Sequence, residues 1–221
     1  MANYLAAFDF IETCDRLDTA PHLVEAFQSL IGTFGMTAFA VGEPGSPRTF
    51  KPDRIWAGTW PAGWAQLWAE QNFVSADPVI YQLLMQNTPF RWADLRRHAS
   101  GRGALIMDSA REFKLFDGFG VAIHSGGGGK AAVTMGGLEC ALSRREEASL
   151  HLASIYFHAR IERVLGKREQ QPFPQLTRRE CDCLSWVAVG KTDWEMSQIL
   201  GIGEATVKEY VHAAMHKLDA R

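Results

Sequence analysis

Three tryptophans and one aspartate lie close together early in the sequence. Trp60, Trp64 and Trp68 are spaced four residues apart, and Asp77 follows soon after them. Trp64 and Trp68 share one face of a helix because their spacing is about one turn, and Trp60 can close over the same side. A buried indole N–H needs an acceptor, and a buried carboxylate needs donors. The pattern is typical either of a tryptophan-filled core or of a pocket that binds a polar guest.

Patterns for catalysis or metal binding are incomplete. A phosphate-binding loop reading of SGGGGK fails because His124 and Ala131 stand where that motif needs glycine and a hydroxyl residue. A hydrolase elbow fails because Ile123 replaces its first glycine. The four cysteines have neither zinc-site nor CxxC spacing. We therefore expect that the protein is not an enzyme and that it has no metal site and no cofactor.

Hydrophobic periodicity predicts the elements that position these residues. The predicted helices span 3–16, 20–34, 63–71, 78–86, 101–116 and 143–168, and the predicted strands span 36–41, 54–60, 118–125 and 130–136. The strands form two antiparallel pairs, the second joined by a glycine-rich turn. Ser143 and Glu146 have capping-box spacing at the start of the long helix. The fold class is α+β, with an N-terminal α/β/α sandwich built on an antiparallel sheet.

A change in composition divides the chain. The segment EQQPFPQ, residues 169–175, has two prolines and no apolar periodicity, which is typical of a linker. Residues 1–168 form the first predicted domain, and residues 176–221 form a second, all-helical domain.

The second domain has two similar helix starts, Thr177 with Glu180 and Thr192 with Glu195, and Gly201 ends the second helix. A third helix follows from about residue 203 to 217. This order predicts either a helix-turn-helix DNA-binding domain or a helical interaction bundle. Six Lys/Arg against seven Asp/Glu give the domain a net charge of −1. If it binds DNA, we expect weak, salt-sensitive binding by the isolated domain.

The second domain resembles the DNA-binding domain of LuxR-type regulators, through L-T-x-R-E, G-K-T, E-M-S-x-I-L-G-I and T-V-K-E-Y-V. The resemblance implies that the third helix is the recognition helix. Lys208 and His212 would face base edges or phosphates, and Thr206 and Tyr210 would contact the DNA backbone. The family usually has histidine at Tyr210 and a further helix beyond Arg221, so we expect a domain that lacks its last helix.

The first domain is similar to the acyl-homoserine-lactone-binding domain of LuxR quorum-sensing regulators, most clearly over residues 56–96. The family pattern W-x-x-x-Y-x(8)-D-P-V, a later P-F-x-W and a strand glycine appear here as Trp64, Trp68, Asp77-Pro78-Val79, Pro89-Phe90-Arg91-Trp92 and Gly118. The resemblance implies that Asp77 accepts the ligand amide N–H and that Trp64 donates to the lactone carbonyl. Trp60 replaces a family tyrosine and would donate to the acyl carbonyl. Trp92 would pack near the lactone ring, and Gly118 would be structural.

Three further residues concern the acyl group of the ligand. Most members carry tyrosine at Trp68, so the larger ring is expected to narrow the channel and favour a short, branched or aromatic acyl group. Thr134 or Met135 is expected to face the acyl end, and the alignment across the four glycines leaves the choice open.

We therefore expect a quorum-sensing transcriptional regulator that binds an acyl-homoserine lactone and then binds a two-fold DNA site as a homodimer, with the long helix as an interface. One alternative is a LuxR-type regulator whose sensor binds another ligand or none. Another is an enzyme acting on lactones, for which no nucleophile is found. No membrane partner is expected, and the absence of a membrane span or an N-terminal leader predicts a cytoplasmic protein.

Overall fold

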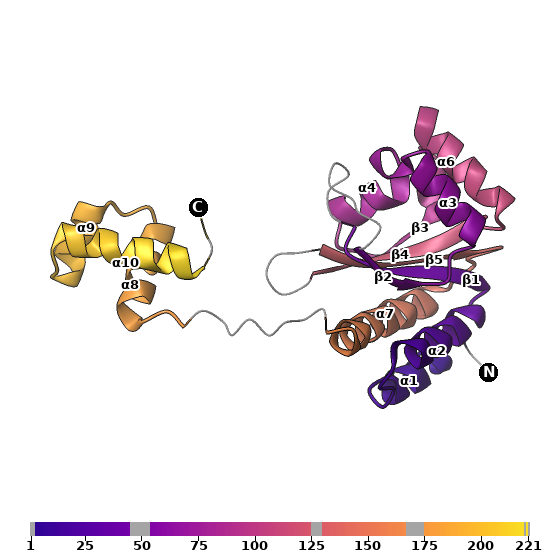
Figure 1. Cartoon of the computed structure of the whole chain (residues 1–221), viewed down its shortest axis with the longest axis horizontal. Coiled ribbons are helices and arrows are strands. Elements are labelled where there is room, and N and C mark those ends of the chain that lie inside the picture. The colour runs from indigo at the N-terminus through magenta and orange to yellow at the C-terminus, as the bar shows by residue number, and fades with distance from the viewer. Residues whose placement is uncertain (1–2, 45–53, 125–129, 167–174, 219, 221) are drawn as a thin grey trace. The chain divides into compact units, whose positions relative to one another are not determined.

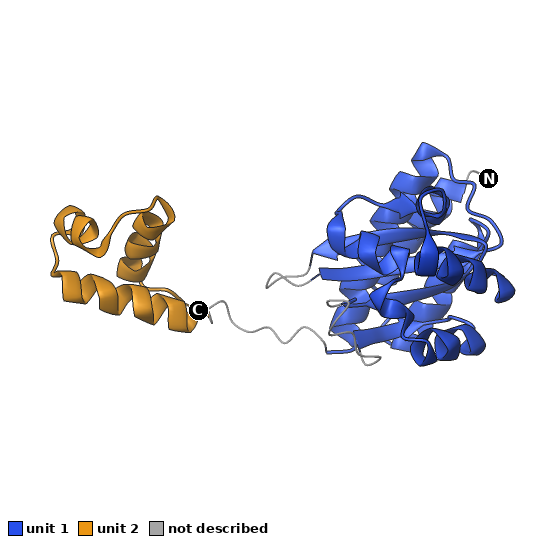
Figure 2. Cartoon of the chain, turned by 90° about the horizontal axis from the view of Figure 1, so that it is seen from above, with its two compact units in different colours: residues 1–168 blue, residues 169–221 orange. Residues whose placement is uncertain are grey.

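The computed structural model describes residues 3–44, 54–124, 130–166, 175–218 and 220, and the chain divides into two compact units, residues 1–168 and 169–221 (Figure 2). Of the predicted linker, only residue 175 is described.

Unit 1 is a three-layer α/β/α sandwich. Its sheet is antiparallel, with the strand order β2-β1-β5-β4-β3. The strands are β1 (Met36–Gly42), β2 (Ile55–Gly58), β3 (Phe90–Arg91), β4 (Asp117–His124) and β5 (Lys130–Gly137), and the helices are α1 (Asn3–Cys14), α2 (Ala20–Gly32), α3 (Ala62–Glu70), α4 (Pro78–Met85), α5 (Trp92–Arg96), α6 (Gly101–Glu112) and α7 (Arg144–Val164). Figure 1 shows α1, α2 and α7 on one face of the sheet and α3, α4 and α6 on the other. The predicted α+β class is confirmed.

The structure differs from the predicted elements in several places. The two predicted strand pairs form one sheet, because β1 also pairs with β5. The short elements β3 and α5 were not predicted, since two and five residues are too few to show periodicity. Helix α6 ends at Glu112 instead of 116, and Lys114 just beyond it has a φ of 63°, which a right-handed helix cannot accommodate.

The two faces of the sheet differ in side-chain size. Toward α1, α2 and α7 the central strands present large apolar residues that pack with Phe27 and Phe157, namely Phe39, Val41, Phe119, Val121, Val133 and Met135. The alternate positions face the other layer because successive strand side chains point to opposite faces. They are small: Ala38, Ala40, Gly118, Gly120, Ala122, Ala132, Thr134 and Gly136. The sheet therefore leaves room on the side of α3 to α6.

Unit 2 contains α8 (Arg178–Ala188), α9 (Asp193–Leu200) and α10 (Glu204–Lys217) around a core of Cys183, Met196 and Val207. The predicted capping boxes are present at α7, α8 and α9. Gly201 ends α9 with a φ of 65°, a left-handed conformation that glycine adopts without strain. The predicted all-helical bundle is confirmed, with α9 and α10 joined by a short turn.

Candidate functional site

Asp77 begins α4 and faces the interior of unit 1. Its Oδ1 accepts a hydrogen bond from the backbone N–H of Val79 at 2.8 Å, so Asp77 is the N-cap of the helix. Its Oδ2 accepts one from the indole Nε1 of Trp68, also at 2.8 Å. Asp77 is only 8% exposed. Because a carboxylate has about four acceptor positions, it retains capacity for a donor from a ligand.

Burial raises the pKa of the Asp77 carboxyl above its ordinary value of 3.8, and hydrogen bonds from Trp68, Val79 and Ile80 lower it by less. The ionised carboxylate is therefore costly in this position, and an additional N–H donor would stabilise it.

An apolar cavity of about 370 Å³ lies beside Asp77, between the sheet and the layer of α3 to α6. Six of the seven residues predicted to bind the ligand line its wall: Trp60, Trp64, Trp68, Asp77, Trp92 and Thr134. Apolar residues of α4 and α6, the small residues Ala40, Gly42 and Ala132 of the sheet, and the polar residues Glu43, Arg54 and Asn72 also line it. The wall is thus mostly apolar, with Asp77 as its buried carboxylate, while the Glu43 side chain is 39% exposed and pairs with Arg54. A mostly apolar wall with a few polar groups is the usual character of a small-molecule site.

Trp92 rests flat on the sheet where two glycines allow it. A Cβ atom on Gly118 would lie 2.7 Å from its Cδ2 and Cε2 atoms, and one on Gly136 would lie 2.8 Å from its Cη2. Trp60 stacks on Trp92, with ring centroids 5.9 Å apart and an interplanar angle of 21°. The Nε1 atom of Trp92 is buried and makes no hydrogen bond within the described part of the chain.

Of the remaining predicted residues, Trp64 and Thr134 line the cavity and Met135 does not. Trp64 is buried on α3 and its ring contacts Phe73 and Phe113. Thr134 lines the cavity, and its Oγ1 is buried without a hydrogen bond among the described residues. Met135 faces the opposite core and is absent from the cavity wall. The expectation that Met135 could face the ligand was wrong because adjacent residues of a strand point to opposite faces.

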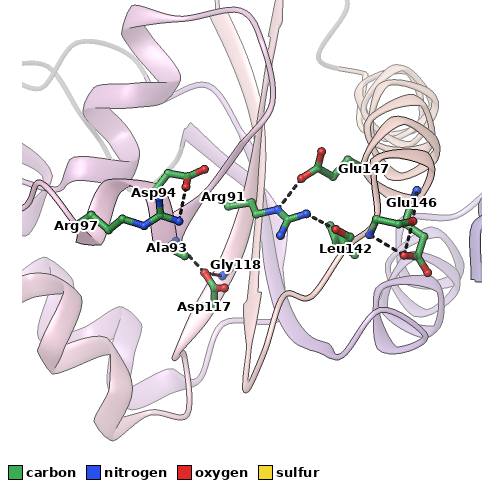
Figure 3. A network of polar contacts seen from close by, with 10 residues as sticks. Arg91, Ala93, Asp94, Arg97, Asp117, Gly118, Leu142, Glu146 and Glu147 are labelled. Carbon is green, nitrogen blue, oxygen red and sulfur yellow. Dashed lines mark hydrogen bonds and ion pairs between the residues drawn. The ribbon is translucent and has the colours of Figure 1, made fainter.

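A polar network next to Trp92 was not predicted (Figure 3). Arg91 donates from Nε to Glu147 Oε1 at 2.6 Å, and its Nη2 donates to the carbonyl of Leu142. On the other side of Trp92, the Oδ1 of Asp117 accepts from the backbone N–H of Ala93 at 2.9 Å. The P-F-x-W pattern indicated this segment, but no local signal showed that residue 91 would reach α7.

The predicted DNA-contacting residues all lie on α10. Lys208 and His212 are exposed and one turn apart, while Thr206 and Tyr210 are partly buried. The Nζ of Lys208 lies 3.0 Å from Glu204 Oε1, and this pairing raises the pKa of the lysine. Tyr210 packs against the core of unit 2.

Lys217 joins the end of α10 to the beginning of α8. Its Nζ lies 2.8 Å from both carboxylate oxygens of Glu180, which also accepts from the backbone N–H of Thr177. These bonds lower the pKa of Glu180. The capping residue of α8 thus also fixes the end of the helix that carries Lys208.

Within the described ranges, no cluster of His, Cys, Asp or Glu side chains could hold a metal ion. Nor is any helix in those ranges long and apolar enough to cross a membrane.

Two protein families match the chain. Residues 19–161 match the autoinducer binding domain, and residues 174–221 match the bacterial regulatory proteins of the luxR family. The quorum sensing-dependent transcriptional regulator RpaR of Rhodopseudomonas palustris is 37% identical over 97% of this chain and 88% of its own length. The transcriptional activator BjaR1 of Bradyrhizobium diazoefficiens is 34% identical over 97% and 89%.

Among solved structures, SdiA in complex with octanoyl-rac-glycerol superimposes with a TM-score of 0.63, covering 100% of this chain and 91% of SdiA at 19% identity. This likeness shows a shared fold. The relatives named above are transcriptional regulators and not enzymes. The two matched domains indicate a small-molecule signal and DNA as partners, and they indicate no cofactor.

Proposed function

Because this chain belongs to the LuxR family of quorum-sensing transcriptional regulators with an autoinducer-binding domain, we propose that an acyl-homoserine lactone occupies the cavity of unit 1. The observation that carries the proposal is the buried Asp77 carboxylate in a mostly apolar, tryptophan-lined cavity. Acyl-homoserine lactones combine one amide N–H with two carbonyl groups and an apolar tail. That combination matches one acceptor, several indole donors and apolar walls.

The ligand roles that we propose are those implied by the family resemblance, at residues that line the cavity. Asp77 accepts the amide N–H, Trp64 donates to the lactone carbonyl, and Trp60 donates to the acyl carbonyl. Trp92 packs against the lactone ring, and Thr134 faces the acyl group. A buried acceptor without a matching donor disfavours binding strongly, so Asp77 selects for ligands with an N–H.

The acyl group is short, branched or aromatic. A cavity of about 370 Å³ lies near the lower end of the range of roughly 300–1,000 Å³ for ligand pockets. Trp68 supports a compact ligand because its ring occupies the cavity wall and its indole N–H is directed to Asp77.

The liganded protein binds a two-fold DNA site as a homodimer, in the cytoplasm. Lys208 and His212 contact base edges or phosphates, and Thr206 and Tyr210 contact the DNA backbone. An apolar strip on α7 supports the dimer, since Leu152, Ile155 and Tyr156 are 38%, 37% and 41% exposed. Ligand binding stabilises unit 1 by mass action because the unfolded chain has no cavity.

A thermal shift titration tests the ligand. The unfolding midpoint of the protein purified without ligand is measured against butanoyl-, isovaleryl-, cinnamoyl- and dodecanoyl-homoserine lactone. We expect a saturable rise with one of the first three and a much smaller rise with dodecanoyl-homoserine lactone. A rise with dodecanoyl-homoserine lactone alone would contradict the compact acyl group.

A second candidate is a LuxR-type sensor for another acyl compound or for no ligand. The same fold holds octanoyl-rac-glycerol in SdiA, so the fold alone does not restrict the ligand to lactones. Adding this glycerol ester to the titration separates the two candidates, because it lacks the amide N–H that Asp77 would bind. A rise with the ester and none with any lactone would favour the second candidate.

A further inference from the structure

We propose that Arg91 is a positioning residue for the ligand cavity: by tying β3 to the start of α7, it fixes Trp92 in the cavity wall. The proposal rests on the proposed function, in that the ligand packs against Trp92. It adds a residue that lies outside the cavity wall and acts through its neighbour in sequence.

The Arg91 side chain makes two hydrogen bonds that connect β3 to α7. The guanidinium leaves the edge strand β3 and donates to Glu147 in the first turn of α7 and to the carbonyl of Leu142 just before that helix. Both partners are more than 50 residues away in sequence, so the bonds join separate parts of the fold (Figure 3). The Arg91 and Glu147 side chains are each 30% exposed. A charge-assisted, half-buried pair of this kind holds its geometry better than a fully exposed ion pair.

A second anchor lies on the other side of Trp92. Asp117 begins β4 and accepts from the N–H of Ala93 at 2.9 Å and from the N–H of Gly118 at 2.8 Å. The backbone is therefore fixed directly before and directly after Trp92. A tryptophan between two fixed residues can turn its ring but cannot slide along the sheet.

The ring of Trp92 is blocked on the sheet side and borders the cavity on the other, and its strand β3 pairs with β4 at two positions, Phe90 with Gly120 and Arg91 with Phe119. The backbones of Gly118 and Gly136 lie directly beneath the ring and prevent movement toward the sheet. The opposite side faces Trp60 and the cavity. The Nε1 atom adds no restraint, because it makes no hydrogen bond within the described ranges. Without the Arg91 side chain, the segment keeps its pairs with β4 and the Ala93–Asp117 bond but loses its link to α7, so we expect Trp92 to shift toward the cavity and reduce the space for the ligand.

The chain offers a matched control. Arg160 on α7 also donates to one backbone carbonyl and one carboxylate, with Nε 3.1 Å from the Leu17 oxygen and Nη2 2.5 Å from Asp18 Oδ1. It ties the same helix to the loop between α1 and α2, on the face of the sheet opposite the cavity. Arg160→Gln should therefore destabilise unit 1 in a similar way without moving Trp92.

The first measurement needs no ligand. The protein is labelled with 5-fluorotryptophan, and the ¹⁹F resonance of Trp92 is identified by its absence in Trp92→Phe. We expect this resonance to shift or broaden in Arg91→Gln and in Glu147→Gln, and to stay in place in Arg160→Gln. An unchanged Trp92 resonance in folded Arg91→Gln protein would overturn the proposal, whatever the ligand is.

The second measurement is lactone affinity, by calorimetry with the lactone that gives the largest thermal shift. We expect Arg91→Gln to bind roughly 3- to 10-fold more weakly and Arg160→Gln to bind like the wild type. In a Trp92→Phe background, Arg91→Gln should have a much smaller effect, since it acts through Trp92. An equal loss in both arginine variants, or the same loss with and without Trp92, would refute the positioning role. Failure of the wild-type protein to bind any lactone would instead refute the proposed function, and the fluorine measurement would still decide the role of Arg91.

Discussion

Asp77→Asn is the substitution that separates ligand binding from folding. Asparagine caps a helix about as well as aspartate, so the side-chain oxygen can keep its bond to the N–H of Val79. The substitution changes the other oxygen, Oδ2, which accepts from Trp68; in our proposal the charged carboxylate also accepts from the ligand N–H. In asparagine this group is either an NH₂ or an uncharged oxygen.

The expected cost differs between the two states. In the ligand-free protein, losing the charged acceptor of Trp68 is offset by removing a buried charge whose pKa is raised by burial. We expect the free energy of unfolding to change by less than about 1 kcal/mol. In the complex, the ligand N–H also loses a charged acceptor, worth about 1.5–3 kcal/mol, or roughly 10- to 150-fold in affinity.

The assay is a titration of the unfolding midpoint and of calorimetric heat with the best lactone, for wild type, Asp77→Asn and Asp77→Ala. Asp77→Ala should lose a further ~1 kcal/mol of stability without ligand, because it also removes the helix cap. Wild-type affinity in Asp77→Asn would refute the assignment of Asp77 as the ligand acceptor. A large loss of ligand-free stability in Asp77→Asn would show that the carboxylate serves the fold instead.

Four other predictions concern pH, the packing of Trp92 on Gly118, DNA binding and the stability of unit 2. The pKa of Asp77 is raised in the folded state, so the native protein binds more protons than the unfolded chain at pH values between the two pKa values. The free energy of unfolding of the wild type should therefore fall, relative to that of Asp77→Asn, as pH rises from about 3.8 to the folded pKa, and then level off. Urea denaturation at a series of pH values measures this difference. Gly118→Ala should lower the melting temperature and weaken ligand binding, because its methyl group would overlap both the Met135 carbonyl oxygen and the Trp92 ring at a cost of about 1–3 kcal/mol. An unchanged melting temperature would contradict this close packing. Lys208→Ala should weaken DNA binding and reduce the slope of log K against log salt by about 0.9, as measured by fluorescence anisotropy; an unchanged slope would exclude a phosphate contact. Glu180→Gln should destabilise unit 2 and leave the ligand-induced shift of unit 1 intact, which two-transition calorimetry can resolve.

Local signals made the helix starts predictable. Ser143, Thr177 and Thr192 each precede a glutamate by three residues, and each forms a capping box, because that motif depends only on neighbouring residues. Asp77 before a proline likewise predicted a helix start. Residue type and spacing left a filled core and a pocket both open for the tryptophan cluster and the lone carboxylate, and the family resemblance favoured the pocket.

Long-range contacts were not predictable in this way. The bond from Trp68 to Asp77 depends on how α3 and α4 pack, and the reach of Arg91 to Glu147 depends on the whole sheet. The choice between Thr134 and Met135 depended on strand register, which four consecutive glycines leave open in the sequence. In the structure, Thr134 pairs with Gly120, which sets its side chain on the cavity face.

The two faces of the sheet carry different residues: one face lines the ligand cavity, and the other forms the hydrophobic core. On the cavity face, the alanines Ala40 and Ala132 line the wall, and each methyl group added or removed there changes the volume available to the ligand. On the other face, the large residues around Phe39 stay packed against the helices. Signal preference can therefore drift by single substitutions while the folding core is unaltered. Related regulators can therefore differ in ligand specificity while they share one fold.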